Sequence, residues 1–213
     1  MTERLLELIN GRYPLTELDT GDMSCLRASG MTFTVRAFHA EGLGHVSVMR
    51  ARGFFGLMKM DTLIVNPKDK DLPLYSYDRI YAMSNDTLIV ELYDTILGDY
   101  SDAALSLVAA EYSDIPERDP GEHWYDSIKL ASSISKKGKK KISARLDELA
   151  LRHAEAYLAS APDAASNAEE KRRRAEDYVT GLLTHGGPST DVFKRALGAE
   201  TTERLFKELL FGV

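Results

Sequence analysis

Two aspartates occupy positions where a β-strand normally carries an apolar residue. Asp61 lies in the run "MKMDTLIV" and Asp78 in the run "LYSYDRIYA", and a polar loop separates the two runs. If the runs pair as a hairpin with Val65 opposite Leu74, Asp61 lies opposite Asp78, with Cβ atoms roughly 4.5–5.5 Å apart. Two opposed carboxylates compete for one proton, so one pKa rises and the pair becomes suited to general acid chemistry.

This hypothesis depends on the register of the hairpin. A shift of one residue would send the two carboxylates to opposite faces of the sheet. The next hairpin would bring Glu91 close to Asp78, and Met60 and Ser76 are uncharged neighbours of the pair. The alternative interpretation is that both aspartates lie on the solvated face of a half-exposed sheet.

The elements that position these residues follow from the hydrophobic periodicity. From about residue 31 to 95 the period is two, which predicts about five antiparallel strands, because the short loops between them hold no crossover helix. Residues 2–11 and most of 98–213 have a helical period. The later helices are expected at about 101–115, 123–136, 142–160, 167–185, 189–197 and 201–211. A sheet followed by helices indicates one α+β domain spanning residues 1–213.

Composition narrows the class of protein. The chain has 213 residues, of which 44% are hydrophobic and 28% charged, with a net charge of -6. We expect no nucleic-acid partner, because a basic footprint would then dominate. The single cysteine, Cys25, excludes an internal disulfide and a cysteine-based metal site. No run approaches the ~20 apolar residues of a membrane span, and no signal peptide is evident. We therefore expect a cytoplasmic protein with no membrane partner.

Three stretches resemble the ferredoxin-dependent bilin reductases. "LIVNPKDKDLPLYSYDRI" followed by "TLIVELYDT" is similar to the sheet core of that family, in which "LP" and an aromatic residue precede an aspartate. "HWYDSIKL" is similar to its tryptophan segment, and "DYVTGLLTHGGPSTDVFKRALGAETTERLFKELLF" to its C-terminal helices. The resemblance covers roughly residues 45–95 and 120–213.

The resemblance implies a three-layer α/β/α sandwich with a central antiparallel sheet. In the family an open-chain tetrapyrrole lies between the sheet and the C-terminal helices. Ferredoxin or flavodoxin supplies single electrons, and no flavin or metal is bound. By this match Asp78 is the proton donor, Asp61 takes a position where the family has His or Asn, and Arg118 pairs with a propionate of the substrate.

The chain also departs from the family pattern. An earlier glutamate of the family is replaced here by Ser47 or Met49, neither of which can donate a proton usefully. An Asp-Lys pair between the last helices is replaced by Gly-Gly-Pro-Ser, and the adjacent His185 is a candidate for a proton relay. His45, before a strand, is a candidate for binding a substrate carboxylate, although a structural role is the alternative.

Two hypotheses for the function stay open. The first is reduction of a linear tetrapyrrole by coupled electron and proton transfer, with docking of acidic ferredoxin by the lysine run Lys139, Lys140 and Lys141. For that run, a solvated loop is the alternative. The second hypothesis is a non-catalytic carrier or sensor that binds haem or a bilin.

Overall fold

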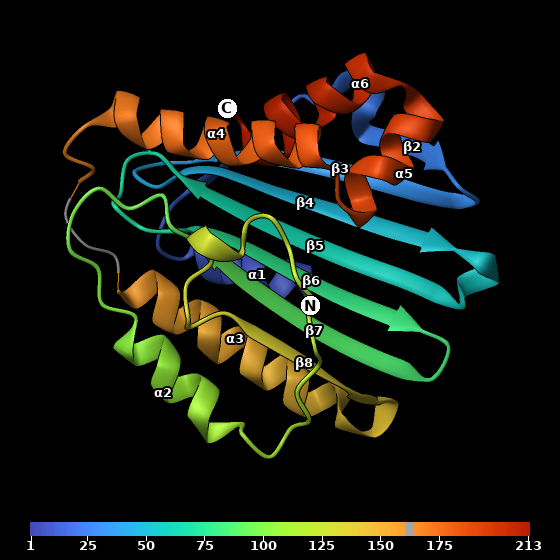
Figure 1. Cartoon of the computed structure of the whole chain (residues 1–213), viewed down its shortest axis with the longest axis horizontal. Coiled ribbons are helices and arrows are strands. Elements are labelled where there is room, and N and C mark those ends of the chain that lie inside the picture. The colour runs from blue at the N-terminus through green and yellow to red at the C-terminus, as the bar shows by residue number, and fades with distance from the viewer. Residues whose placement is uncertain (161–163) are drawn as a thin grey trace.

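An antiparallel sheet of eight strands forms the centre of the molecule (Figure 1). The computed structural model describes residues 1–160 and 164–213, and the backbone alone at positions 188 and 189. The strands follow the order β1-β3-β4-β5-β6-β7-β8, and β2 pairs with β3. Their bounds are β1 Leu15–Leu18, β2 Cys25–Ala28, β3 Met31–Ala40, β4 Gly44–Gly53, β5 Met58–Pro67, β6 Leu74–Ala82, β7 Asn85–Tyr93 and β8 Ile134–Lys139.

Helices cover both faces of this sheet, so the predicted α/β/α sandwich is confirmed (Figure 1). One face packs against α1 (Thr2–Asn10), α2 (Ala103–Glu111) and α3 (Ser143–Ala159). The other face packs against α4 (Ala168–His185), α5 (Pro188–Leu197), α6 (Ala199–Arg204) and the π-helix η5 (Leu205–Phe211). Short 3-10 turns are η1 Gly21–Ser24, η2 Phe54–Gly56, η3 Asp126–Ile128 and η4 Lys140–Ile142.

The sheet is larger than predicted. The five central strands, β3 to β7, lie where the period of two placed them, but β1, β2 and β8 were not expected. The helix expected at 123–136 is wrong: this stretch contains only the turn η3 and the start of β8. Its end forms a strand because Ile134–Lys139 completes the backbone hydrogen bonds of β7, which would otherwise be a long open edge.

The predicted register of the β5–β6 hairpin is wrong by one residue. Val65 pairs with Tyr75 rather than with Leu74, so Asp61 lies opposite Arg79 and Asp78 lies opposite Thr62. The two carboxylates therefore point to opposite faces of the sheet. The observed register also sets opposite charges across the hairpin, whereas the predicted one would have opposed two carboxylates.

Asp61 consequently has a structural role and not a place in the row of Asp78. Its carboxylate forms a salt bridge with Arg52 at 2.6 Å, on the face covered by α1 and α3. Its predicted place beside Asp78 is thus corrected, and so is the proposal that the two acids share one proton.

Candidate functional site

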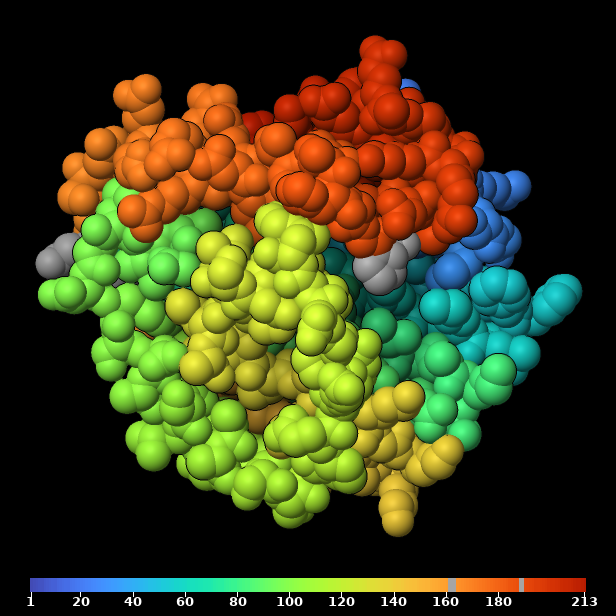
Figure 2. Space-filling model, viewed as in Figure 1, coloured from blue at the N-terminus to red at the C-terminus, as the bar shows by residue number. Residues whose placement is uncertain are grey.

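The side chain of Asp78 lies on the face of the sheet that the C-terminal helices cover. Register places Thr62, Asp78, Ile89 and Ser135 in one row across β5, β6, β7 and β8. Most residues of β6 and β7 that point to this face are only partly buried. The residues that alternate with them point to the opposite face, where most are buried in the core. Figure 2 shows the reason: atoms of the central strands lie in a recess between the C-terminal helices and the loop that precedes β8.

Burial gives Asp78 the properties of a general acid. Desolvation raises the pKa of its carboxyl group from the ordinary 3.8 to about 6, against the opposing effect of a hydrogen bond from Thr62. The Thr62 hydroxyl donates to the Asp78 carboxylate at 2.5 Å. Among the described residues Asp78 forms no salt bridge, so no cation holds it in its charged form. A carboxyl group with a pKa near 6 can hold and release a proton close to neutral pH.

Glu91 provides a second carboxylate on the same face, as predicted. Glu91 lies opposite Ser76, and this pair is the next one on the same face after the pair of Asp78 and Ile89. The charge of Glu91 contributes to the raised pKa of Asp78. The hydroxyl of Tyr93 donates to Glu91 at 2.7 Å, and the ammonium group of Lys129 lies 3.9 Å from the Glu91 carboxylate. Glu91 is therefore held in place by two partners, while Asp78 is held by one.

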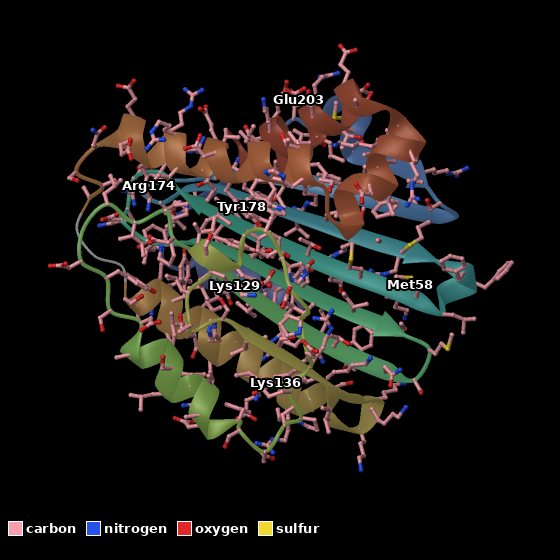
Figure 3. The ribbon with its side chains drawn as sticks, in the orientation of Figure 1. Met58, Lys129, Lys136, Arg174, Tyr178 and Glu203 are labelled. Carbon is pink, nitrogen blue, oxygen red and sulfur yellow. The ribbon has the colours of Figure 1, made fainter. Side chains whose placement is uncertain are left out.

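Aromatic rings form a wall beside these carboxylates. Tyr93 lies with its ring centroid 4.2 Å from that of Tyr178 and 5.4 Å from that of Tyr125. Burial raises the pKa of all three phenols, so they stay protonated and can act as hydrogen-bond donors. Figure 3 labels Tyr178 on α4 and Lys129 on the segment before β8, the two elements that frame this part of the face.

Trp124 and His185 lie at the rim of this wall. Their ring centroids are 5.2 Å apart, and Trp124 packs on α4 at Gly181, where a Cβ atom would come within 2.2 Å of the indole. His185 is exposed at the end of α4. The structure thus places His185 beside the aromatic wall and not beside Asp78.

Three other predicted residues lie on or next to this face. Met60 and Ser76 flank the row that contains Asp78, and both are partly exposed to the recess. Arg118 lies at the β8 end of the same row, where its guanidinium contacts the hydroxyl of Ser135 at 3.4 Å. Two strand spacings, roughly 10 Å, separate Ser135 from Asp78. A cation at that distance suits an acidic group on a ligand that covers the row.

His45 lies on the same face, but its side chain is buried. Its Nε2 is 2.8 Å from the carbonyl oxygen of Leu209, and burial lowers its pKa to about 4. The ring also packs against Gly212, where a Cβ atom would come within 2.4 Å of it. This histidine joins β4 to the C-terminal π-helix, which is the structural alternative of the sequence analysis.

The chain contains two basic runs, at positions 136–141 and 171–174, and neither is a uniform charged surface. Lys139, Lys140 and Lys141 are exposed at the end of β8, but Lys136 is buried and its ammonium group contacts the carboxylate of Glu117. In the second run, Lys171 is buried and donates to the carbonyl oxygen of Leu72 at 2.5 Å. The first lysine of each run is thus a structural element.

Sequence reasoning missed Thr62, Lys129 and Tyr178. Thr62 precedes no motif, but it follows Asp61, and a register shifted by one residue would have identified it as the partner of Asp78. Lys129 is the second-last residue of the quoted tryptophan segment, and Tyr178 is the second residue of the quoted C-terminal stretch. Both were therefore inside the segments that carried the resemblance, although no single-residue signal marked them.

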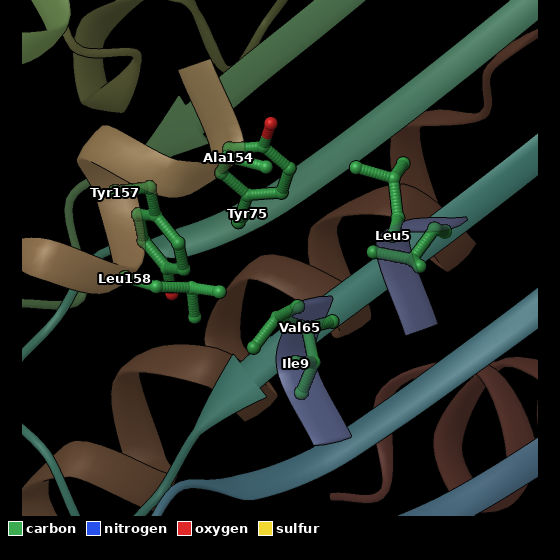
Figure 4. A pocket seen from close by; sticks show the side chains of 8 residues that line it. Leu5, Ile9, Val65, Tyr75, Ala154, Tyr157 and Leu158 are labelled. Atoms are coloured by element: carbon green, nitrogen blue, oxygen red, sulfur yellow. The ribbon is translucent and has the colours of Figure 1, made fainter. Parts of the chain in front are cut away.

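A second hollow in the described part of the molecule lies on the opposite face. It is a small apolar cavity of about 10 Å³ between α1, α3, β5 and β6, lined by Leu5, Ile9, Leu63, Val65, Tyr75, Ala154, Tyr157 and Leu158 (Figure 4). That volume is close to one water-sized probe, and the lining offers almost no polar partner. This cavity is a packing defect of the core and not a ligand site.

Two further kinds of site are absent from the described residues. No group of three His, Cys, Asp or Glu side chains within them is arranged to hold a metal ion. None of the described helices combines the length and the apolar character needed to cross a bilayer.

Comparison with known proteins supports the fold. No protein-family model matches the chain, and no curated protein matches its sequence. Among solved structures, the chain is similar to phytochromobilin synthase from tomato in complex with biliverdin, with a TM-score of 0.77 and 15% sequence identity. The match covers 99% of this chain and 81% of that one. The chain therefore has the fold of a bilin reductase, with a sequence that has diverged widely.

Proposed function

We propose that this protein belongs with the ferredoxin-dependent bilin reductases and reduces a linear tetrapyrrole by coupled electron and proton transfer. The substrate would lie in the recess over β5, β6 and β7, under the C-terminal helices. Asp78 would donate a proton to the radical that forms when the first electron arrives. Asp78 carries this proposal, because it is a partly buried carboxyl group that forms no salt bridge among the described residues, on a sheet face that is partly open.

Three kinds of evidence support this assignment. The solved structure with the same fold contains biliverdin, which is a linear tetrapyrrole. Tyr125 is the partly exposed ring of the tyrosine wall and offers an aromatic face to a conjugated ring system, whereas Tyr93 and Tyr178 are buried in the core. Arg118 places positive charge at one edge of the recess, where an acidic propionate of a tetrapyrrole would be attracted, while Lys129 is already paired with Asp126 at 2.6 Å.

Glu91 replaces part of what the chain lacks relative to the family. The proposed second acid, Asp61, faces the other core, and Ser47 is occupied by a hydrogen bond to the carbonyl oxygen of Leu210 at 2.7 Å. Glu91 is the remaining carboxylate on this face within one residue pair of Asp78 among the described residues. In this proposal it raises the pKa of Asp78 and orients the substrate together with Lys129.

Electrons would come from a soluble one-electron carrier such as ferredoxin or flavodoxin, without a flavin or metal held by this chain. Lys139, Lys140 and Lys141 are exposed, and complementary charge accelerates the encounter with an acidic carrier. Reduction should then slow as salt rises, because exposed charges are screened within ~10 Å at 0.1 M. A rate that is independent of salt would remove these lysines from the proposal.

A tetrapyrrole carrier or sensor without catalysis is the second candidate. One observation favours it: the two carboxylates expected to share a proton lie on opposite faces of the sheet. In this case the recess binds a bilin or haem, and Asp78 forms a hydrogen bond to a pyrrole nitrogen without transferring its proton to carbon.

Absorption spectroscopy separates these functions. Biliverdin, bilirubin and haem are added separately to the protein, and each spectrum is recorded before and after addition of reduced ferredoxin. Reductase activity predicts that biliverdin binds and that its long-wavelength band is lost only when protein and donor are both present. A bound but unchanged bilin would identify a carrier. No spectral change with any of the three compounds would contradict both proposals.

A further inference from the structure

One end of the sheet exposes large apolar side chains that none of the described residues covers. The turn between β4 and β5 presents Phe54, Phe55 and Leu57, which are 53%, 109% and 65% exposed, and the turn between β6 and β7 presents Met83, which is 92% exposed. Seven large hydrophobic side chains of the described residues are exposed, and these two adjacent turns hold four of them. We call these four residues the apolar tip. Exposed apolar groups gathered in this way mark an interaction surface.

The two turns are held side by side. The amide of Met83 donates to the carbonyl oxygen of Leu57 at 3.1 Å, and Met58 pairs with Ala82 at the ends of β5 and β6. In Figure 1 both turns lie at the end of the sheet opposite to the chain segments that enter α2 and α4. The four side chains of the apolar tip therefore form one surface.

Backbone strain accompanies this exposure. The structure gives positive φ to four described residues other than glycine, and three of them are Phe54, Phe55 and Met83, with φ of 52°, 55° and 57°. Bulky side chains rarely adopt this left-handed conformation, and glycine or asparagine would adopt it with less strain. Neither burial nor local geometry explains large apolar residues at these positions. Strain of this kind gathers at functional sites, so a requirement for exposed apolar groups explains the choice.

Positive charge surrounds the apolar tip. The register places Lys139 beside Asn85 at the same end of the sheet, and the Lys139 ammonium lies 3.0 Å from the side-chain oxygen of Asn85, two residues after Met83. Lys140 and Lys141 follow, and Lys59 projects from the start of β5. Among the described residues none of these four lysines forms a salt bridge.

The acidic residues nearest to this end are neutralised within the fold. Asp61 pairs with Arg52 at 2.6 Å, and Asp86 pairs with Arg79 at 2.5 Å. The end of the sheet is therefore positive in a chain whose net charge is -6. Its charge complements an anionic surface, whatever the sign of the rest of the molecule.

We infer that the apolar tip inserts into an anionic lipid bilayer and that the four lysines contact the headgroups. Side chains as exposed as Phe55 and Met83 are separate projections, which enter a deformable apolar layer. A stable protein interface instead buries about 800 Å² on each partner with matched shape. Apolar groups that penetrate about 5–10 Å, with cations set behind them, are the pattern of peripheral membrane binding.

This inference goes beyond the proposed function and does not depend on it. We expected no membrane partner because no segment is long enough to span a bilayer. A contact made by turns at the end of a sheet requires no spanning segment. In Figure 2 the recess opens toward the viewer, whereas the turns after β4 and β6 lie at the right edge of the molecule, so a protein held by the apolar tip would keep the recess open.

Co-sedimentation with vesicles tests the inference. The full chain is mixed with vesicles of phosphatidylcholine alone or of phosphatidylcholine with phosphatidylglycerol. We expect binding to the anionic vesicles that weakens as salt rises, and much weaker binding to the neutral ones. Phe55→Asn should reduce the partition coefficient about tenfold or more, because it removes one inserted ring. Asparagine tolerates positive φ, so this variant should melt at the same temperature as the original chain or higher.

Matched controls make the outcome decisive. Leu107 is 68% exposed on α2, away from the apolar tip, and Leu107→Asn should leave vesicle binding unchanged. Met83→Gly relieves strain and should also weaken binding. Absence of binding to anionic vesicles, equal binding to neutral ones, or an equal loss in Leu107→Asn would overturn the inference. So would binding of reduced or oxidised ferredoxin that Phe55→Asn abolishes while vesicles are ignored, since this result would identify a protein partner.

Discussion

Two charged residues that are neighbours in sequence have opposite environments on the two faces of the sheet. Arg79 projects into the face covered by α1, α2 and α3, where it is fully buried and its guanidinium contacts Asp86 at 2.5 Å and Asp147 at 3.3 Å. Asp78, one residue earlier, projects into the face covered by the C-terminal helices and has a single hydrogen bond, from Thr62. The first charge is neutralised by partners and the second is not.

The difference separates a structural charge from a chemical one. A buried ion must be paired and hydrogen-bonded, or its pKa shifts until it is neutral. Arg79 satisfies the first condition, because the hydroxyl of Ser143 and the carboxylate of Asp147 complete its network with Asp86. Asp78 follows the second course in part: burial raises its pKa to about 6, so that a minor fraction of the carboxyl groups still holds a proton at pH 7. A group that exchanges a proton near neutral pH is useful in a reaction, whereas a paired one is useful in a fold.

The largest expected effect comes from removing the proton of Asp78. Asp78→Asn keeps the shape and can still accept the Thr62 hydrogen bond, but it has no transferable proton. We expect single-turnover reduction of biliverdin, followed by absorbance, to slow by a factor of ~10²–10⁴ while binding of the bilin changes little. The matched control is Asp61→Asn, on the preceding strand but on the other face. Undiminished turnover in Asp78→Asn, or an equal loss in Asp61→Asn, would contradict the comparison of the two faces.

On the other face, the expected effect is on stability. Arg79→Ala leaves the buried carboxylate of Asp86 and the partly exposed one of Asp147 without this cation, and we expect the free energy of unfolding to fall by about 3–5 kcal/mol. The control is Arg36→Ala, which breaks a half-exposed pair with Glu17 and should lower it by about 1 kcal/mol or less. Denaturant unfolding measures both. Similar losses in the two variants would show that burial of the Arg79 network has no special importance.

Much of the fold could be predicted from periodicity, because that signal is local. The helices at 2–10, 143–159 and 168–185 and the strands β3 to β7 lie close to their predicted bounds. β8 could not be predicted, because "ISKKGK" has the composition of a solvated loop and becomes a strand through pairing with β7. Its buried Lys136 is satisfied by the carbonyl oxygen of Ile115 and by Glu117, residues that the sequence does not connect with it.

The site was predicted less well than the fold, and the register is the reason. Asp78 and Glu91 could be predicted to share a face because side chains alternate along a strand, so the face of each residue follows from its position along its own strand. The partner of Asp78 needed the register, and the loop between β5 and β6 has no tight turn to set it. That loop is instead positioned by Asp71, whose carboxylate accepts hydrogen bonds from the amides of Leu97 and Gly98 and contacts Lys171. These contacts span long distances in sequence.

A smaller effect links the chemistry of Asp78 to stability. Its pKa is about 6 in the folded protein and has an ordinary value of 3.8, so between these values the folded state holds a proton that the unfolded state has released. The free energy of unfolding therefore falls as pH rises through this window. Asp78→Asn has no such dependence, so it should be more stable than the original chain by about 1–3 kcal/mol at pH 7.

Chemical unfolding at several pH values measures this difference. The advantage of Asp78→Asn should shrink as pH falls from 7 and vanish below about pH 4, where the carboxyl is protonated in both states. Asp61→Asn again provides the control, because it loses the salt bridge with Arg52 and should gain no stability at any pH. An advantage of Asp78→Asn that persists at low pH would show that ionisation of Asp78 is not its cause.

The smallest effect concerns Glu91, which shares the open face with Asp78. Its negative charge contributes to the raised pKa of Asp78, after the larger effect of burial. Glu91→Gln removes the charge but can still accept the hydrogen bond from Tyr93, so the pKa of Asp78 should fall. The pH at which single-turnover reduction declines should move to a lower value, and the rate at pH 7 should fall by less than about tenfold. Glu203→Gln, an exposed change on α6, should move neither quantity. In the Asp78→Asn background, the part of the Glu91→Gln effect that acts through the pKa of Asp78 should be absent, so the further loss of turnover should be smaller than in the original chain. A second loss as large as the first would mean that Glu91 acts independently of Asp78, and an unchanged affinity for the bilin in that variant would identify Glu91 as a second proton donor rather than as a residue that orients the substrate.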